Sequence, residues 1–307
     1  MSATPVLPPD IVVFERGWLS SNNILLLAGP VCALVDSGYC THSGQTLALL
    51  RQSLGRRPLD LLLNTHLHSD HCGGNALLQQ SYPALQTLIP PGLSEHVHHW
   101  SAHALTFEPT GQQCPPFRFD GLLRPGASMR IGERNWQIHA AKGHDPHSVI
   151  LFDPASRTLI SADALWESGF GIVFPELEGL DAFDEVAQTL DLIESLQPLH
   201  VIPGHGPVFS DVRQALLTAR RRLAGFVTDP GKHARYAAKV LLKFKLLEAQ
   251  QMQQQALLAW VGNTQHMRTL HDKLARELPF NTWVGSLLDD LVASGAALRV
   301  GDVVANL

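Results

Sequence analysis

The chain has 307 residues, of which 45% are hydrophobic and 17% are charged, and its net charge at pH 7 is −5. These values are typical of a globular protein with one large domain, or with one domain and a smaller one, and the net charge does not indicate a general polyanion binder. The best apolar run, residues 24–35, is interrupted by Gly29 and Pro30 and is too short to span a bilayer. The first residues lack the basic and apolar regions of a secretory signal, and the four cysteines form no C-x-x-C pair. We therefore expect a cytoplasmic protein without membrane contact.

The first 210 residues alternate short apolar runs with turn residues, which predicts a mixed α/β fold. Gly29 and Pro30 are expected to turn a hairpin within residues 24–38. Apolar residues at helical spacing predict helices over residues 43–54 and 183–196. The other apolar runs predict strands at residues 59–63, 135–141, 148–153, 158–163 and 199–202.

The sequence becomes mostly helical after about residue 212. Helices are predicted over residues 234–248, 264–277 and 282–294, with a polar patch or helix junction at 250–255 and a terminal hairpin around Gly301 and Asp302. Helices followed by a hairpin resemble a winged helix. We therefore predict a first domain of residues 1–212 and a winged-helix-like domain of residues 213–307.

One turn concentrates metal-ligating side chains. Residues 64–75 read N-T-H-L-H-S-D-H-C-G-G-N, and such groups are costly to bury without a partner. His66 and His68 are two residues apart, so on an extended segment they face the same way and can share one metal ion. Asp70 and His71 lie where the chain turns and can hold a second ion, while the neighbouring Cys72 is expected to pack behind the ligands.

Two ligands do not complete a zinc site, so the others must come from elsewhere in the chain. The candidates are His144 in G-H-D-P, Asp163 in S-A-D and His205 in P-G-H-G, and each follows a predicted strand. A lone histidine is more often a surface or core residue. The complete set, in this order and at strand ends, predicts a metal centre.

The motifs T-H-L-H-S-D-H, G-H-D-P, A-D-A and G-H-G, with L-V-D-S-G at residues 34–38, resemble those of the metallo-β-lactamase-fold hydrolase superfamily, in its glyoxalase II and lactonase-like branch. The resemblance covers residues from about 10 to 210. It implies a four-layer αβ/βα sandwich as the catalytic domain and two divalent metal ions, with zinc preferred over iron or manganese. It further implies that His66, His68 and His144 bind one ion, that Asp70, His71 and His205 bind the other, that Asp163 bridges them and that Asp36 supports a ligand from behind.

The resemblance implies hydrolysis of an ester, thioester or lactone by a hydroxide that bridges the metal ions. Asp70 would also transfer a proton to the leaving group. Trp166, Phe170 and Phe174 either line an apolar acyl pocket for a small-molecule substrate or belong to the core. The lactonases of this superfamily commonly use a tyrosine near the site. No tyrosine lies between Asp163 and His205 in this chain, which disfavours a lactone as the substrate.

Two other functions stay open on the sequence. A sulfur dioxygenase with a single iron shares the H-x-H-x-D-H motif, and a metal-sensing regulator could bind nucleic acid through the C-terminal region. Residues 211–250 contain nine Lys or Arg against three Asp or Glu, and Lys232, Arg235, Lys239 and Lys243 form one helical stripe. Helix 282–294, however, carries two aspartates and no Lys or Arg, so we expect no nucleic-acid binding.

Two further features of the sequence leave alternatives open. The C-terminal region is expected to shape a substrate pocket or the interface of a homodimer, with one or two cations of the stripe contacting an acidic group of the substrate.

A second histidine cluster predicts a lid or a surface helix; its members are His96, His98, His99 and His103.

Overall fold

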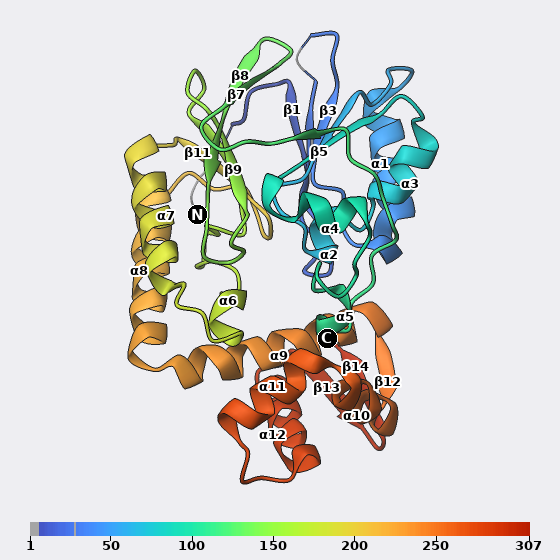
Figure 1. Ribbon diagram of the computed structural model, residues 1–307, viewed down its shortest axis with the longest axis vertical. Helices are drawn as coiled ribbons and strands as arrows, with labels where there is room; N and C mark the ends of the chain where they lie inside the picture. The colour runs from blue at the N-terminus through green and yellow to red at the C-terminus, as the bar shows by residue number, and fades with distance from the viewer. Residues whose placement is uncertain (1–5, 28) are drawn as a thin grey trace. The chain divides into compact units, whose positions relative to one another are not determined.

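The computed structural model describes residues 6–27 and 29–307. The chain divides into two compact units. Figure 1 colours it by residue number, from blue at the N-terminus to red at the C-terminus. The first unit comprises Met1–Leu105 and Cys114–Leu223, and the second comprises Thr106–Gln113 and Ala224–Leu307. Residue 212, the predicted domain boundary, is the first residue of helix α8 (Val212–Thr228). The predicted domain limits stay a prediction.

Two sheets form the centre of the first unit. The six-stranded sheet has the order β1 to β6, with β1, β2 and β3 antiparallel and β3 to β6 parallel. Its strands are β1 (Ile11–Phe14), β2 (Asn23–Leu26), β3 (Ala33–Val35), β4 (Leu61–Leu63), β5 (Gln86–Ile89) and β6 (Gly121–Leu122). The five-stranded sheet has the order β11-β10-β9-β8-β7, antiparallel except for the parallel pair β10 and β11. Its strands are β7 (Ser128–Ile131), β8 (Arg134–Ala140), β9 (Val149–Asp153), β10 (Thr158–Ala162) and β11 (His200–Pro203).

The main core lies between the two sheets. Val35 and Leu63 from the six-stranded sheet share one buried cluster with Trp136, Leu151 and Ile160 from the five-stranded sheet. The inner strands are apolar on both faces because helices cover the outer faces as well. All five residues of β9 and of β10 are buried, which explains their continuous apolar sequences.

Helices form the two outer layers of the first unit (Figure 1). Leu47, Leu50 and Leu54 of α1 (Ser43–Leu54) pack in one cluster with Leu34 and Leu62 of the six-stranded sheet. Helix α7 (Phe183–Leu196) and α8 lie outside the five-stranded sheet. The arrangement is the predicted four-layer αβ/βα sandwich. The bounds of α1 and α7 agree with the sequence prediction, whereas β4 begins at Leu61 rather than at residue 59.

The shorter helical segments of the first unit lie mostly in the connections. They are α2 (Ser69–Cys72), α3 (Asn75–Ser81), α4 (Ser94–His98), α6 (Phe174–Leu177) and the 3-10 turns Cys40–His42 and Pro91–Leu93. The second histidine cluster lies in and after α4, where all four of its side chains are exposed.

The second unit is mostly helical and ends in a small sheet. Its helices are α5 (Phe107–Thr110), α9 (Pro230–Ala249), α10 (Gln254–Asn263), α11 (Gln265–Leu274) and α12 (Phe280–Ala293). Strands β13 (Ala297–Val300) and β14 (Val303–Asn306) form the predicted terminal hairpin. Segment 250–255, predicted as a polar patch or helix junction, joins α9 to α10. It also contains β12 (Gln251–Gln253), which pairs with β14, a long-range partner that local polarity does not reveal. The winged-helix resemblance stays a prediction.

The basic stripe on α9 is occupied by partners within the second unit. The Arg235 guanidinium lies 2.9 Å and the Lys239 ammonium 3.4 Å from Oδ2 of Asp290 on α12. The Lys243 ammonium donates to the Ala296 carbonyl and to Asn306 Oδ1. Three of the four cations therefore stabilise the fold of this unit. Along the described chain, no helix is both long and apolar enough to cross a membrane.

Candidate metal centre

Four connections carry the predicted metal-ligating residues, and each begins at the end of a strand. The histidine turn follows β4, His144 follows β8, Asp163 follows β10 and His205 follows β11. The strands of both sheets thus deliver these side chains to the same end of the sandwich. All seven predicted residues are brought together there, in three overlapping groups whose ligand atoms lie within 4.8 Å of one another.

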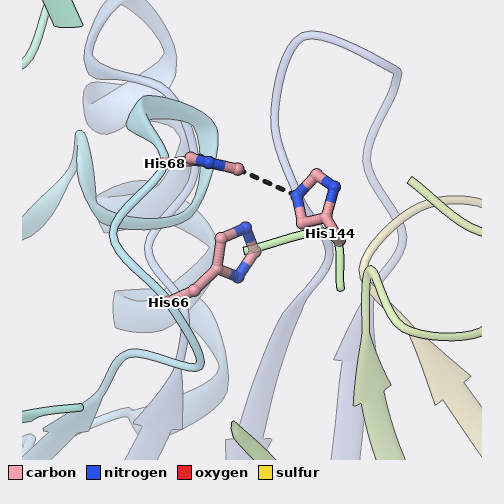
Figure 2. Close-up of side chains that lie close together, drawn as sticks. All are labelled: His66, His68 and His144. Carbon is pink, nitrogen blue, oxygen red and sulfur yellow. Dashed lines mark hydrogen bonds between the residues drawn. The ribbon is translucent and has the colours of Figure 1, made fainter. Parts of the chain in front are cut away.

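The first group comprises His66, His68 and His144 (Figure 2). The ring nitrogens His144 Nε2 and His68 Nδ1 lie 2.8 Å apart. The ring centroid of His66 lies 4.6 Å from that of His68 and 5.0 Å from that of His144. Figure 2 shows the three rings pointing toward a common space from two different connections.

The second group comprises Asp70, His71 and His205. Asp70 Oδ2 lies 3.0 Å from His205 Nε2 and 3.7 Å from His71 Nε2. Asp163 lies between this group and the first one. Its Oδ1 is 3.5 Å from His71 Nε2, and its Oδ2 is 3.4 Å from His144 Nε2 and 3.9 Å from His205 Nε2. One carboxylate therefore contacts histidines of both groups.

Hydrogen bonds on the outer side orient two of these rings. His71 Nδ1 donates to Asp36 Oδ2 at 2.8 Å, which leaves Nε2 directed at the centre. Asp36 also accepts from the Thr65 backbone N–H and hydroxyl, at 2.9 and 2.7 Å. Its φ of +58° is a left-handed conformation that aspartate tolerates better than most residues. His144 Nδ1 donates to the Ile172 carbonyl at 2.5 Å, so its Nε2 also faces the centre.

The donor set fits divalent metal ions. His66 Nε2 and His71 Nε2 are buried and have no hydrogen-bond partner among the described residues. Orphaned buried nitrogens are costly in a folded protein unless a Lewis acid occupies the space between them. Imidazole nitrogens and carboxylate oxygens are the ligands expected for zinc, and imidazole also suits iron. Cys72 is buried behind the ligands, where its thiol donates to the His68 carbonyl at 3.3 Å.

The electrostatics of the centre agree with a cation site. Burial lowers the pKa of His66 well below its ordinary value, and burial with the nearby His144 lowers the pKa of His68 to about 4. Burial acts to raise the pKa of Asp163, but His71 and His205 outweigh it and hold the pKa well below its usual range. Burial likewise acts against a charged His71, yet Asp163 and Asp36 raise its pKa well above the ordinary value. Negative charge therefore dominates around His71.

The backbone makes room for this convergence at Gly204. A Cβ at Gly204 would lie 2.1 Å from Asp163 Oδ1 and 3.0 Å from His71 Cε1, so only glycine allows the β11 connection to approach so closely. Ala162, directly before Asp163, has a φ of +46°, and the pairing of β10 with β11 is irregular at the same point. Strained backbone of this kind is concentrated at functional sites.

The predicted substrate residues occupy three different environments. Trp166 Nε1 donates to Asp163 Oδ1 at 3.2 Å, and Trp166 is 8% exposed. Phe174 is half-buried, with its ring centroid 4.8 Å from that of His68. Phe170 is buried, and the Arg222 guanidinium lies over its ring.

Trp18 was not predicted as a site residue, yet the structure places it beside His205. Their ring centroids lie 5.3 Å apart with an interplanar angle of 12°, and Trp18 is 53% exposed. It lies in the irregular connection between β1 and β2, which carries no local motif of a site, so no signal in the sequence could have found it.

Comparisons with known proteins agree with this arrangement. The sequence model of one protein family, the metallo-beta-lactamase superfamily, matches residues 16–208, which are more than half of the chain. The acyl-coenzyme A thioesterase MBLAC2 of Gallus gallus is 27% identical over 217 residues, which are 65% of this chain and 78% of the relative. The hydroxyacylglutathione hydrolase of Anaeromyxobacter dehalogenans (strain 2CP-C) is 29% identical over 162 residues, 52% of each chain.

A solved structure shows the same fold over nearly the whole chain. It is the crystal structure of a metallo-beta-lactamase family protein from Thermus thermophilus, with a TM-score of 0.59 and 18% identity, covering 98% of this chain and 100% of that one. At this identity the likeness concerns the fold alone. With the family match and the named relatives, it confirms the resemblance predicted from the motifs: the chain belongs to the metallo-beta-lactamase superfamily and is one of its hydrolases.

Proposed function

We propose that this protein is a dinuclear metal-dependent hydrolase that acts on a thioester or another ester of a small molecule. The observation that carries the proposal is the convergence of seven metal-ligating side chains around two buried ring nitrogens without hydrogen-bond partners among the described residues. In this assignment His66, His68 and His144 hold one ion, and Asp70, His71 and His205 hold the other. Asp163, which contacts histidines of both groups, bridges them. Zinc is the first candidate, followed by iron and manganese.

When bound, two such ions polarise a carbonyl group and lower the pKa of a water molecule from about 15.7 toward about 7, which supplies a nucleophile at neutral pH. The other steps of the proposed reaction depend on side chains of the protein. Asp163, with a side chain only 6% exposed, holds the two ligand groups together. The Asp70 side chain is 14% exposed, more than that of Asp163. Because Asp70 Oδ2 contacts His205 and His71, we assign Oδ1 the transfer of a proton to the leaving group.

Two observations support the proposed class of substrate, namely the names of the relatives and the aromatic residues beside the proposed ligands. One relative is named an acyl-coenzyme A thioesterase and the other a hydroxyacylglutathione hydrolase, which favours an acyl group carried on a thiol. Trp166 and Phe174 lie beside the ligands and are proposed to contact the acyl group, with Phe170 behind them. A lactone is less favoured, because no tyrosine lies between Asp163 and His205.

The test is a metal titration with a panel of substrates. Metal-free protein would be prepared by chelation, reloaded with zinc, iron(II) or manganese(II), and assayed against chromogenic esters, acyl-coenzyme A and acylglutathione thioesters, and lactones. The proposal expects no hydrolysis by the metal-free protein, full activity at two ions per chain, and the highest kcat/KM on a thioester. Full activity in the metal-free protein would rule the mechanism out.

The other two functions predict different results in the same preparations. A sulfur dioxygenase would consume oxygen with a persulfide substrate faster than it hydrolyses any ester, and would need one iron per chain. A nucleic-acid-binding regulator would bind duplex DNA at near-physiological salt with little hydrolysis. The pairing of Arg235 and Lys239 with Asp290 disfavours the regulator, because cations that stabilise the fold are less available to phosphates.

A further inference from the structure

His205 differs from His71 and His144 in how its ring is held. A metal-binding histidine almost always donates its second ring N–H to a carboxylate or a carbonyl, which fixes the orientation of the ring. His71 has Asp36 for this purpose and His144 has the Ile172 carbonyl. His205 Nδ1 is buried and has no hydrogen-bond partner in the described parts of the chain. Another interaction must therefore orient this ring.

Two indoles enclose the His205 ring. Trp18 lies nearly parallel to it, with ring centroids 5.3 Å apart and an interplanar angle of 12°. Trp166 meets it edge-on, with ring centroids 5.5 Å apart at 81°. The two indoles also contact each other at 5.3 Å and 69°. Face and edge contacts together restrict rotation of the imidazole about its side-chain bonds.

The connection that carries Trp18 also fixes the backbone on both sides of His205. The Asn22 backbone N–H donates to the Gly204 carbonyl at 2.6 Å. The Asn22 side-chain amide donates to the Pro203 carbonyl at 3.0 Å and to the Gly206 carbonyl at 2.8 Å. One fully buried side chain thus bridges the residues that flank His205.

The connection reaches the other ligands of the second ion as well. The backbone N–H of Ser21 donates to the Asp70 carbonyl at 2.9 Å. Residues 18–22 therefore contact both His205 and the helix that carries Asp70 and His71, which are the three proposed ligands of the second ion.

We propose that residues 18–22 position the second metal ion, and that stacking by Trp18 replaces the hydrogen bond that His205 lacks. The inference rests on the proposed function, since it takes His205 as a ligand. Binding of a cation to His205 increases the positive character of the imidazole, and the negative face of an indole attracts positive charge. The stack therefore strengthens when the ion binds. Trp18 is a positioning residue and, being 53% exposed, contributes little to the core.

The experiment compares Trp18→Ala, Trp18→Phe and Trp100→Ala with the wild-type protein. Trp100 is a half-buried indole that packs edge-on against Phe117, so its loss controls for removal of an indole elsewhere. Each protein would be titrated with zinc against a chelating indicator, and its unfolding temperature would be measured without metal. We expect Trp18→Ala to bind the first ion normally and the second about 10- to 100-fold more weakly, as for other residues that orient metal ligands. Trp18→Phe should recover most of the affinity, and Trp100→Ala should bind two ions like the wild type.

The outcomes separate this inference from the proposed function. If the wild type binds two ions and Trp18→Ala binds both with unchanged affinity, only the positioning role is overturned. If Trp18→Ala weakens both ions equally and lowers the unfolding temperature, the role is structural and the inference is also overturned. A wild-type protein that binds a single ion overturns the dinuclear proposal and this inference together.

Discussion

The ring nitrogens His144 Nε2 and His68 Nδ1 lie 2.8 Å apart, although the two residues are 76 positions apart in the chain. His68 approaches from the turn after β4 and His144 from the connection between β8 and β9 (Figure 2). His144 is fixed from behind by its hydrogen bond to Ile172. These two nitrogens, with the orphaned His66 Nε2, are the three ligand atoms proposed for the first metal ion.

Replacement of His144 by alanine should therefore empty the first metal position. The variant should retain about one zinc ion per chain after dialysis, because the second group keeps its three ligands. Hydrolysis should fall by more than about 100-fold, since removal of a ligand costs more than the 10–100-fold effect of an outer partner. Metal content by elemental analysis and kcat/KM on the best thioester measure the two effects. Two tightly bound ions in this variant would contradict the assignment.

Asp163 and His205 should differ in the number of ions that they control. Asp163 contacts histidines of both groups, whereas His205 contacts Asp70 and Asp163 on the side of the second ion. Asp163→Ala should weaken both ions, and His205→Ala should mainly release one. Calorimetric titration of the two metal-free variants with zinc distinguishes the patterns. Loss of the same single ion from both variants would argue against a bridging carboxylate.

Asp36 should act on the metal through His71 without touching it. The Asp36→Asn variant keeps the shape of the side chain but weakens the hydrogen bond from His71 Nδ1. Zinc affinity at the second position should fall by about 10- to 100-fold. Asp60→Asn is a matched control, because Asp60 Oδ2 accepts from the Cys32 backbone N–H away from the ligands. If Asp36→Asn and Asp60→Asn bind zinc with equal affinity, Asp36 does not support the second metal position through His71.

The proposed ligand residues, and Asp36 within L-V-D-S-G, could be predicted from the sequence better than the other supports, and the reason is physical. His66, His68, Asp70 and His71 fall in one short turn, so their spacing alone indicates shared metal ions. The partners that orient the rings act through tertiary contacts. Ile172 accepts through its backbone carbonyl, and Trp18 stacks on His205 from a distant part of the chain, so neither leaves a pattern in the local sequence.

The same distinction applies to the fold. Helices α1 and α7 follow from local periodicity and agree with the predicted bounds. Strands β1, β5, β6 and β7 were not predicted, because short strands depend on their neighbours in the sheet more than on their own residues. Strand β12 exists because β14, much later in the chain, is available to pair with it.

Gly204 should be essential for the metal centre because no side chain fits between its backbone and the proposed ligands. A methyl group there would meet the Asp163 carboxylate and the His71 ring, both held by other contacts. Gly204→Ala should lose affinity for both ions. Gly225→Ala is the matched control, because a Cβ at Gly225, within α8, meets nothing within 4 Å. Since alanine is the better helix former by about 1 kcal/mol, the control should keep both ions and unfold at a slightly higher temperature. If Gly204→Ala binds two ions tightly, the backbone at this position can shift to accommodate the methyl group and the prediction is wrong.

An ion-pair network lies away from the proposed metal ligands and joins Arg134 to Asp10 and Asp153. Arg134 donates to both oxygens of Asp10 at 2.6 Å and to Asp153 Oδ2 at 2.7 Å. The side chains of Arg134 and Asp10 are about one-fifth exposed, and Asp153 is buried. The hydrogen bond from Arg134 lowers the pKa of Asp10 despite partial burial. For Asp153, burial acts in the opposite direction, but Ser156 and Arg134 outweigh it and the pKa is lowered.

Replacement of Arg134 by methionine should destabilise the protein at neutral pH, because the buried Asp153 carboxylate loses its cation. The expected loss in the free energy of unfolding is about 2–4 kcal/mol, near the range for breaking a buried ion pair. A carboxylate with a lowered pKa in the folded state contributes stability above its unfolded pKa, about 3.9, and that contribution is lost as the pH falls through the folded value. The difference between wild type and variant should therefore be constant from pH 7 to about pH 5 and shrink below about pH 4. Urea unfolding of the metal-free proteins across this pH range measures the difference in the free energy of unfolding.

Arg220→Met is the control. It should change the free energy of unfolding by less than about 1 kcal/mol at every pH, because the partners of Arg220, Asp191 and Glu194, are exposed. A difference for Arg134→Met that grows as the pH falls would contradict the assigned direction of both pKa shifts.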